Sequence, residues 1–508
     1  MKRVSFIFES CKEAIRVIFL GFFFIAIGFL IKNESINIFY TFKSTFILYT
    51  AEYCLKIGEC IVVNMPIIFM LNLVCKKTNS AFPLISALLG YFAFLVATMI
   101  FAPTNLDANA YITNSFINSV FGVVENNTRL PLNTGLLGSF IVAFITRYTF
   151  IRSRHNNMAY SNSYFDKDLF GMFLNILLCT IAGLLMSFVY PTIYLQFVRL
   201  LEYIASYLSD PLRIGIYGVL DRMFSILGMP NVIRNSFYYT SMGGSITIQS
   251  TNQTVVGDVN IWNAVKNMSG SFTAGRCITP YYVINIFVIP FIYFGIYNTI
   301  TNKKEKSRFL FVFIVLSVLS IVCGNPLPAE LFLLFSAPLL LIVYLIIVGI
   351  IFGLLTYFEI FLGSNIVGYN AFTAMPGNLP DYLINLRNVY HLEALRDIAI
   401  VGVVFAVIMY LIVFVYFHFL AIDDASLLNK NGFANEIYDA IGGKKNIDSC
   451  TSGLFRVIIE TKEFDKIDFE KVKNLNSSRI FETKSGINID VGSSAFILAK
   501  TINADLKK

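Results

Sequence analysis

The sequence predicts a polytopic α-helical membrane protein with about 10 transmembrane helices and two re-entrant hairpins, followed by a small cytoplasmic α+β domain. The first observation is compositional: 56% of the 508 residues are hydrophobic and 14% are charged, and the mean hydropathy is +0.68. This balance excludes a water-soluble globular enzyme, whose polar surface needs more charge. The second observation is where the charge lies. Residues 421–508 carry 13 basic and 13 acidic side chains, so the net charge of +7 belongs to residues 1–420.

Apolar stretches near the ~20 residues that cross a bilayer are the expected transmembrane helices. They lie at residues 14–31, 57–74, 84–103, 136–151, 169–190, 281–300, 309–323, 331–358 and 397–420. Short basic clusters between them, such as Lys76 with Lys77 and residues 303–308, favour the cytoplasmic side for these loops. By the same rule, the last apolar stretch delivers the C-terminal region to the cytoplasm.

Two segments interrupt the apolar pattern. Residues 205–280 include DPLRIGIYGVLDRMFSILGMPNVIRN, and residues 322–338 read VCGNPLPAELFLLFSAP. Irregular backbone at membrane depth is tolerated only where protein or a water-filled cavity covers it. Two interrupted segments in a chain of transporter size therefore predict re-entrant hairpins with a substrate site between them.

The C-terminal region has the pattern of a small α+β domain. Residues 433–443 place apolar side chains four apart and end in two glycines, which predicts a helix. Residues 453–461 and 486–492 are rich in β-branched side chains and predict strands, and residues 493–506 predict a closing helix. We therefore expect a membrane domain at 1–422 and a cytoplasmic domain at 423–508.

Six segments, in their order and spacing, resemble a sugar permease of the bacterial phosphotransferase system (PTS), of the glucose/maltose/N-acetylglucosamine type with fused membrane (IIC) and cytoplasmic (IIB) parts. They are NMPIIFMLNLVCKKTNSAFPLISALLGYFAF (64–94), NTGLLGSFIVAFITR (133–147), IYGVLDRMFSILG (216–228), GSFTAGRCITPYY (270–282), GNPLPAELFLLFSAP (324–338) and IYDAIGGKKNIDSCTSGLFRV (437–457). The resemblance implies a sugar substrate that receives a phosphoryl group from a IIB cysteine. It also implies a IIA domain and a phosphocarrier protein as partners, a homodimer, and a location in the inner (plasma) membrane of a bacterium.

The positions that carry the family's chemistry have diverged. Laid on the IIB pattern without gaps, the position of the phosphoacceptor cysteine holds Gly453, and Cys450 lies three residues upstream. Because a thiolate carries the phosphoryl group, Cys450 is the candidate catalytic residue only if the alignment shifts. The first hairpin has Gly228-Met229-Pro230-Asn231 where the family has paired histidines, and the second has Leu327 where the family has a glutamate. Whether the chain is an enzyme is therefore open.

The polar residues that persist in the membrane domain are the candidates for substrate binding. They are Arg222, Asn231, Thr273, Arg276 and Glu330. A buried charge in a membrane is costly and marks either a substrate contact or an internal ion pair. Both roles are open for these residues.

Three functions remain in view. The chain is a PTS-type sugar transporter with phosphoryl transfer retained through Cys450, or a relative with impaired or lost transfer that acts as a sugar facilitator or membrane sugar sensor, or a structural partner of an active permease. No cysteine or histidine spacing indicates a metal site, no phosphate-binding glycine motif indicates a nucleotide cofactor, and the basic residues lack the interleaved aromatics of nucleic-acid binding.

Overall fold

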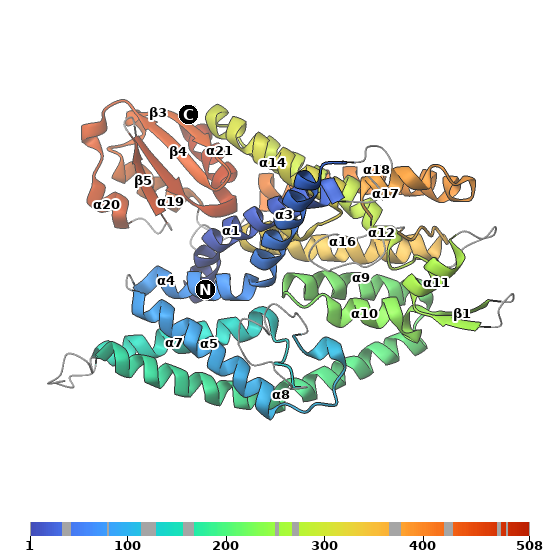
Figure 1. Cartoon of the computed structure of the whole chain (residues 1–508). Helices are drawn as coiled ribbons and strands as arrows, with labels where there is room; N and C mark the ends of the chain where they lie inside the picture. Colours follow the sequence, from blue (N-terminus) through green and yellow to red (C-terminus); the bar gives the residue numbers. More distant parts are fainter. Residues whose placement is uncertain are drawn as a thin grey trace. The chain divides into compact units, whose positions relative to one another are not determined.

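The computed structural model of the chain describes residues 2–32, 42–78, 81–112, 129–155, 167–248, 253–266, 274–364, 377–420, 430–474, 479–483 and 486–506 (Figure 1). The chain divides into two compact units. The N-terminal unit comprises Ser10–Pro280 and Val348–Met375, and the C-terminal unit comprises Met1–Glu9, Tyr281–Ile347 and Pro376–Lys508. The predicted domain boundary at 422 and 423 lies outside the described residues.

Long apolar helices make up most of the N-terminal unit, as the hydropathy predicts. They are α1 (Lys2–Lys32), which starts in the other unit, α3 (Thr45–Val63), α4 (Met65–Thr78), α5 (Ala81–Phe101), α7 (Gly135–His155) and α8 (Lys167–Tyr207). Helices α5, α7 and α8 pack against one another (Figure 1). The contact between α5 and α8 is close because Gly183 has no side chain, and a Cβ there would lie 2.6 Å from the carbonyl oxygen of Phe94. The predicted span at 57–74 falls on α3 and α4, which are bent by 55°.

The interruption predicted between 205 and 280 consists of short elements. They are α9 (Asp210–Ile226), α10 (Asn231–Tyr239), β1 (Ser245–Ile248), β2 (Gln253–Val256) and α11 (Asp258–Val265). Strands β1 and β2 form an antiparallel pair. Gly228, at φ +79°, makes the left-handed turn that reverses the chain between α9 and α10. The first hairpin that the sequence predicts is therefore α9 and α10.

The C-terminal unit contains the second interruption. Its membrane elements are the second half of α12 (Thr279–Tyr282), a π-helical segment (Val283–Val288), α13 (Ile289–Thr299), α14 (Lys303–Cys323), α15 (Leu327–Ser336), the first part of α16 (Pro338–Tyr357), α17 (Leu379–Asn385), α18 (Leu392–Val415) and a second π-helical segment (Tyr416–Leu420). Gly324 caps α14 in the left-handed conformation, at φ 65° and ψ 32°. Helix α15 has 10 residues, too few to cross a bilayer. It fits the predicted re-entrant segment.

The C-terminal region is the predicted α+β fold, with two strands more than the sequence pattern showed. Its elements are α19 (Lys430–Ala440), β3 (Ile447–Ser452), β4 (Arg456–Thr461), α20 (Phe469–Asn474), β5 (Arg479–Thr483), β6 (Gly486–Asp490) and α21 (Ala495–Leu506). The sheet has the order β3-β4-β6-β5, with every neighbouring pair antiparallel. Buried side chains of α19 and α21, among them Ile437 and Leu498, pack with Val457 and Ile489 of the sheet.

The helices confirm a polytopic membrane protein. Within the described residues, 8 helices are long and apolar enough to cross a membrane, or up to 9 if the bent pair of α3 and α4 is one span. This count is close to the ten expected from the sequence. Short 3₁₀ turns complete the described structure, at Ala108–Ala110, Ser241–Gly243, Val389–His391, Lys444–Asn446, Phe464–Lys466 and Gly492–Ser494.

Candidate functional site

A charged network is buried in the hairpin of α9 and α10. Asp221 accepts hydrogen bonds from Arg234 Nε at 2.7 Å and from Arg222 Nη2 at 2.9 Å. Ser225 Oγ accepts from both guanidinium groups, at 2.9 Å from Arg222 and 3.0 Å from Arg234. The Asp221 and Arg222 side chains are fully buried, and Arg234 is 5% exposed. One carboxylate therefore serves two guanidinium groups.

The turn of the hairpin explains how this network forms. Asp221 and Arg222 lie in the second half of α9, and the turn at Gly228 brings Arg234 of α10 back beside them. The structure thus places the candidate Arg222 in an ion pair inside the hairpin. Asn231, another candidate, is the first residue of α10 and is exposed. Asp221 and Arg234 were not singled out from the sequence. Two opposite charges in an otherwise apolar hairpin could have indicated them, because buried charges are usually paired.

Arg276 lies in a turn that Asp258 organises. The carboxylate of Asp258 is 1% exposed and accepts backbone N–H groups of Gly275 at 2.8 Å, Arg276 at 3.2 Å and Cys277 at 2.9 Å. The Arg276 side chain pairs with Asp210 at the start of α9. Arg276 is therefore largely engaged in holding the N-terminal unit together. Thr273, the neighbouring candidate, lies outside the described residues.

Glu330 is buried in the second hairpin. It lies in the first turn of α15, where the positive end of the helix dipole favours a carboxylate. Glu330 is 0% exposed, and its Oε1 accepts a hydrogen bond from the hydroxyl of Tyr344 at 2.9 Å. Leu327 starts the same helix and is 4% exposed. This end of α15 therefore holds one fully buried carboxylate, and an apolar side chain stands three residues before it.

Cys450 is buried in the middle of β3, not exposed at a strand end. It pairs with Ile459 of β4, and its side chain, 5% exposed, packs in the core of the C-terminal region. Burial raises the pKa of the Cys450 thiol to about 12. At neutral pH the sulfur is a protonated thiol, which is a poor nucleophile.

Gly453, at the position that the family alignment gives to the phosphoacceptor, lies in the turn between β3 and β4. Its N–H donates to the carbonyl oxygen of Arg456 at 2.8 Å, and its φ is not positive. Backbone conformation therefore does not require a glycine here. In the present arrangement the space beside it is filled, because a Cβ at this position would overlap Oε2 of Glu305 and that carboxylate would have to move. Sequence reasoning gave no role to Glu305, which lies 148 residues away along the chain.

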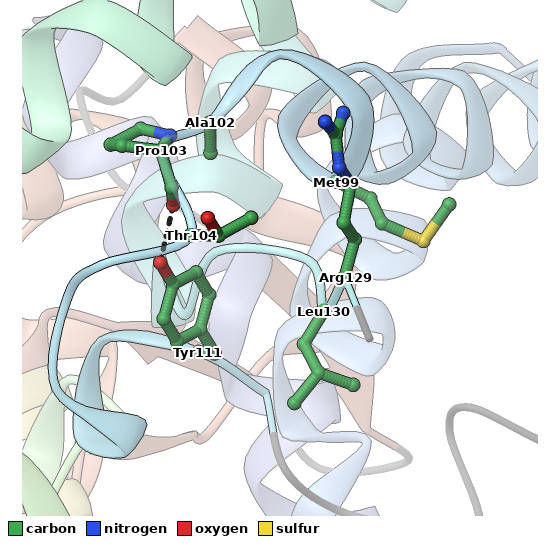
Figure 2. A pocket seen from close by; sticks show the side chains of 7 residues that line it. All are labelled: Met99, Ala102, Pro103, Thr104, Tyr111, Arg129 and Leu130. Carbon is green, nitrogen blue, oxygen red and sulfur yellow. Dashed lines mark hydrogen bonds between the residues drawn. The ribbon is translucent and has the colours of Figure 1, made fainter. Parts of the chain in front are cut away.

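A small pocket lies at the C-terminal end of α5 (Figure 2). Its lining comprises Met99, Ala102, Pro103, Thr104, Tyr111, Arg129 and Leu130. The Tyr111 hydroxyl donates to the carbonyl oxygen of Pro103, and Arg129 Nη1 donates to that of Ile100 at 2.6 Å. The pocket has a volume of about 40 Å³, enough for a few water molecules and too little for a sugar. It includes none of the candidate residues.

These features define a class: a polytopic membrane protein with two broken segments that hold buried charges, and with an α+β domain at its C-terminal end. No protein-family model matches the chain. The chain is similar to the PTS system glucoside-specific EIICBA component of Staphylococcus carnosus (strain TM300), with 23% identity over 372 residues. The match covers 71% of this chain and 51% of the relative, so the chain spans about half the length of that protein. The similarity confirms the resemblance to PTS sugar permeases with IIC and IIB parts.

Proposed function

We propose that the chain is a PTS-type sugar transporter subunit that binds its sugar in the membrane domain and does not pass a phosphoryl group through its C-terminal domain. One observation carries the loss of transfer: the turn that would hold the phosphoacceptor offers no thiolate. Gly453 has no side chain, and the Cys450 thiol is buried and protonated. A phosphocysteine needs an exposed, ionised sulfur.

The membrane domain supports the same proposal. Phosphoryl transfer to a sugar hydroxyl benefits from a nearby base, and neither Leu327 nor Asn231 is a base near neutral pH. Glu330 keeps a buried carboxylate, so hydrogen bonding to a sugar hydroxyl is retained in our proposal. The name of the relative makes glucosides the first sugars to test.

The location of the C-terminal domain belongs to the proposal as well. Thr301 and Asn302, beside the basic start of α14, donate hydrogen bonds to Ser452 at the end of β3. The rule that basic loops face the cytoplasm therefore supports a cytoplasmic domain at 423–508 in a bacterial plasma membrane. The alternatives without transfer are a sugar facilitator, a membrane sugar sensor and a structural partner of an active permease. A facilitator moves a sugar, a sensor binds one, and a structural partner does neither.

A phosphorylation assay tests the proposal on the full chain. The purified protein in lipid nanodiscs is incubated with a phosphorylated IIA domain and phosphocarrier protein, and intact mass is measured at neutral pH. We expect no gain of phosphate, while an active IIC–IIB permease in the same reaction gains one. A gain that disappears in Cys450→Ser would refute the proposal and establish Cys450 as the acceptor.

A further inference from the structure

The end of β3 is hydrogen-bonded to the segment that leads into α14. The backbone N–H groups of Thr301 and Asn302 both donate to the carbonyl oxygen of Ser452, each at 3.0 Å. In return, the N–H of Ser452 donates to Thr301 Oγ1 at 2.8 Å. The side-chain amide of Asn302 adds a bond to Thr451 Oγ1 at 3.0 Å. Both segments belong to the C-terminal unit, and the carbonyl oxygen of Ser452 accepts from two successive N–H groups.

The N-terminal cap of α14 leaves the Glu305 carboxylate available to contact the C-terminal domain. Asn302 caps the helix by accepting the N–H of Glu305 at 3.1 Å. In a reciprocal capping box the Glu305 carboxylate would return to the N–H of Asn302. That N–H is already bound to Ser452. The carboxylate turns instead to the C-terminal domain, where Arg456 Nε donates to Glu305 Oε1 at 3.1 Å.

Gly453 leaves room for the Glu305 carboxylate, because it has no side chain. Glu305 is 8% exposed, and its second oxygen, Oε2, occupies the space that any side chain at Gly453 would need. An apolar contact extends the interface, because the ring of Phe455 lies 5.8 Å from that of Phe332 in α15. The turn of residues 452–456 thus combines backbone hydrogen bonds at Ser452, an ion pair at Arg456 and, at Gly453, a space that the Glu305 carboxylate fills.

From this geometry we propose that the turn of residues 452–456 is a docking surface for the start of α14 of the same chain, and that Glu305 latches it. The latch goes beyond the proposed function, because it makes the C-terminal domain a fixed part of the C-terminal unit, not a mobile carrier. A side chain at 453 would displace the carboxylate of Glu305 from its present place beside Arg456.

Hydrogen exchange of the full chain in nanodiscs, read by mass spectrometry, tests the latch without any sugar or phosphoryl donor. The reporting amides are those of Thr301, Asn302 and Ser452. Gly453→Ala should speed their exchange several-fold, because the methyl group displaces the carboxylate from Arg456. Glu305→Ala removes the same bond and should also speed exchange, and the double variant should exchange no faster than the faster single variant, since both changes break one interaction.

Controls separate release of the latch from unfolding of the domain. Glu463→Ala, which removes an exposed ion pair with Lys466, should leave all three amides unchanged. Amides of β4 and β6 report whether the domain stays folded. If Gly453→Ala unfolds the domain, a charge swap tests the latch instead. Glu305→Arg should speed the exchange of the three amides, and Glu305→Arg with Arg456→Glu should restore their protection. Unchanged exchange in Gly453→Ala with a folded domain, additive effects of Gly453→Ala and Glu305→Ala, or no rescue by the charge swap would overturn the proposal.

Discussion

At the scale of single residues, the sulfur of Cys450 makes a direct prediction about reactivity. The Cys450 thiol is buried in the core and has a pKa of about 12. At pH 8 a small thiol reagent should therefore alkylate Cys450 roughly a hundredfold more slowly than an exposed thiol. A matched control is Cys450→Ser with Ser449→Cys, which moves the thiol to the opposite face of β3. Quenched alkylation and peptide mass spectrometry give both rates. Equal rates would show that Cys450 is accessible after all.

The same thiol links stability to alkaline pH. The unfolded chain ionises Cys450 near pH ~8.5, whereas the folded chain keeps it protonated up to about pH 12. The raised pKa therefore contributes stability below the unfolded value, and this contribution is lost as pH rises through that window. Cys450→Ser should flatten the decline of the melting temperature between these pH values, and an unaltered decline would count against a buried thiol.

Two residues, Glu305 and Arg234, show what the sequence alone could not predict. The family alignment, which uses the sequence alone, predicts that Gly453 stands at the acceptor position. The carboxylate that fills the space beside it, on Glu305, is brought there by tertiary packing, which no local pattern reports. The same holds for Arg234, which reaches Asp221 only because the hairpin turn folds α10 back on α9.

At the scale of elements, glycine positions set how closely the helices approach. Gly183→Val should lower the melting temperature of the purified protein by several degrees, because its Cβ would meet the backbone of α5 at Phe94, which has little freedom to move. Ile181→Val, at an outward-facing position of α8 that is 47% exposed, is the matched control and should have little effect. A similar loss in both variants would mean that α8 itself, and not its contact with α5, is sensitive.

Most elements follow from periodicity, and the exceptions have physical reasons. Most long apolar helices, α19, β4, β6 and α21 overlap the predicted segments. The predicted span at 57–74 instead straddles α3 and α4, and α8 continues past the predicted end at 190 to Tyr207. Strand β3 was missed because it is an edge strand, and its sequence IDSCTS is polar where an interior strand would be apolar. Strand β5 is the other edge of the same sheet. The break of residues 331–358 into α15 and α16 falls at Ala337 and Pro338, where the prolines had predicted an interruption.

At the scale of the whole molecule, sugar binding is the measurement that distinguishes a transporter or sensor from a structural partner. The chain has a single tryptophan, Trp262, which is fully buried, so its fluorescence can report on ligand addition. With a panel of glucosides and hexoses, we expect a saturable change, and Glu330→Gln should weaken binding about tenfold or more by removing a charged hydrogen-bond acceptor.

A control variant and a second binding assay accompany the Glu330→Gln measurement. Glu393→Gln, at a side chain that is 81% exposed, is the matched control and should bind as the unaltered chain does. Equilibrium dialysis with a labelled sugar replaces fluorescence if Trp262 proves silent. Equal affinity in Glu330→Gln would remove Glu330 from the proposed site, and no binding of any sugar would favour the structural partner.

The overlap between Glu305 and position 453 also constrains how this chain can change by descent. A cysteine introduced at 453 would need the place that the Glu305 carboxylate now holds, so that carboxylate would have to leave Arg456. A substitution at 453 is therefore not independent of residue 305, which lies 148 positions away along the chain. We expect the two positions to change together.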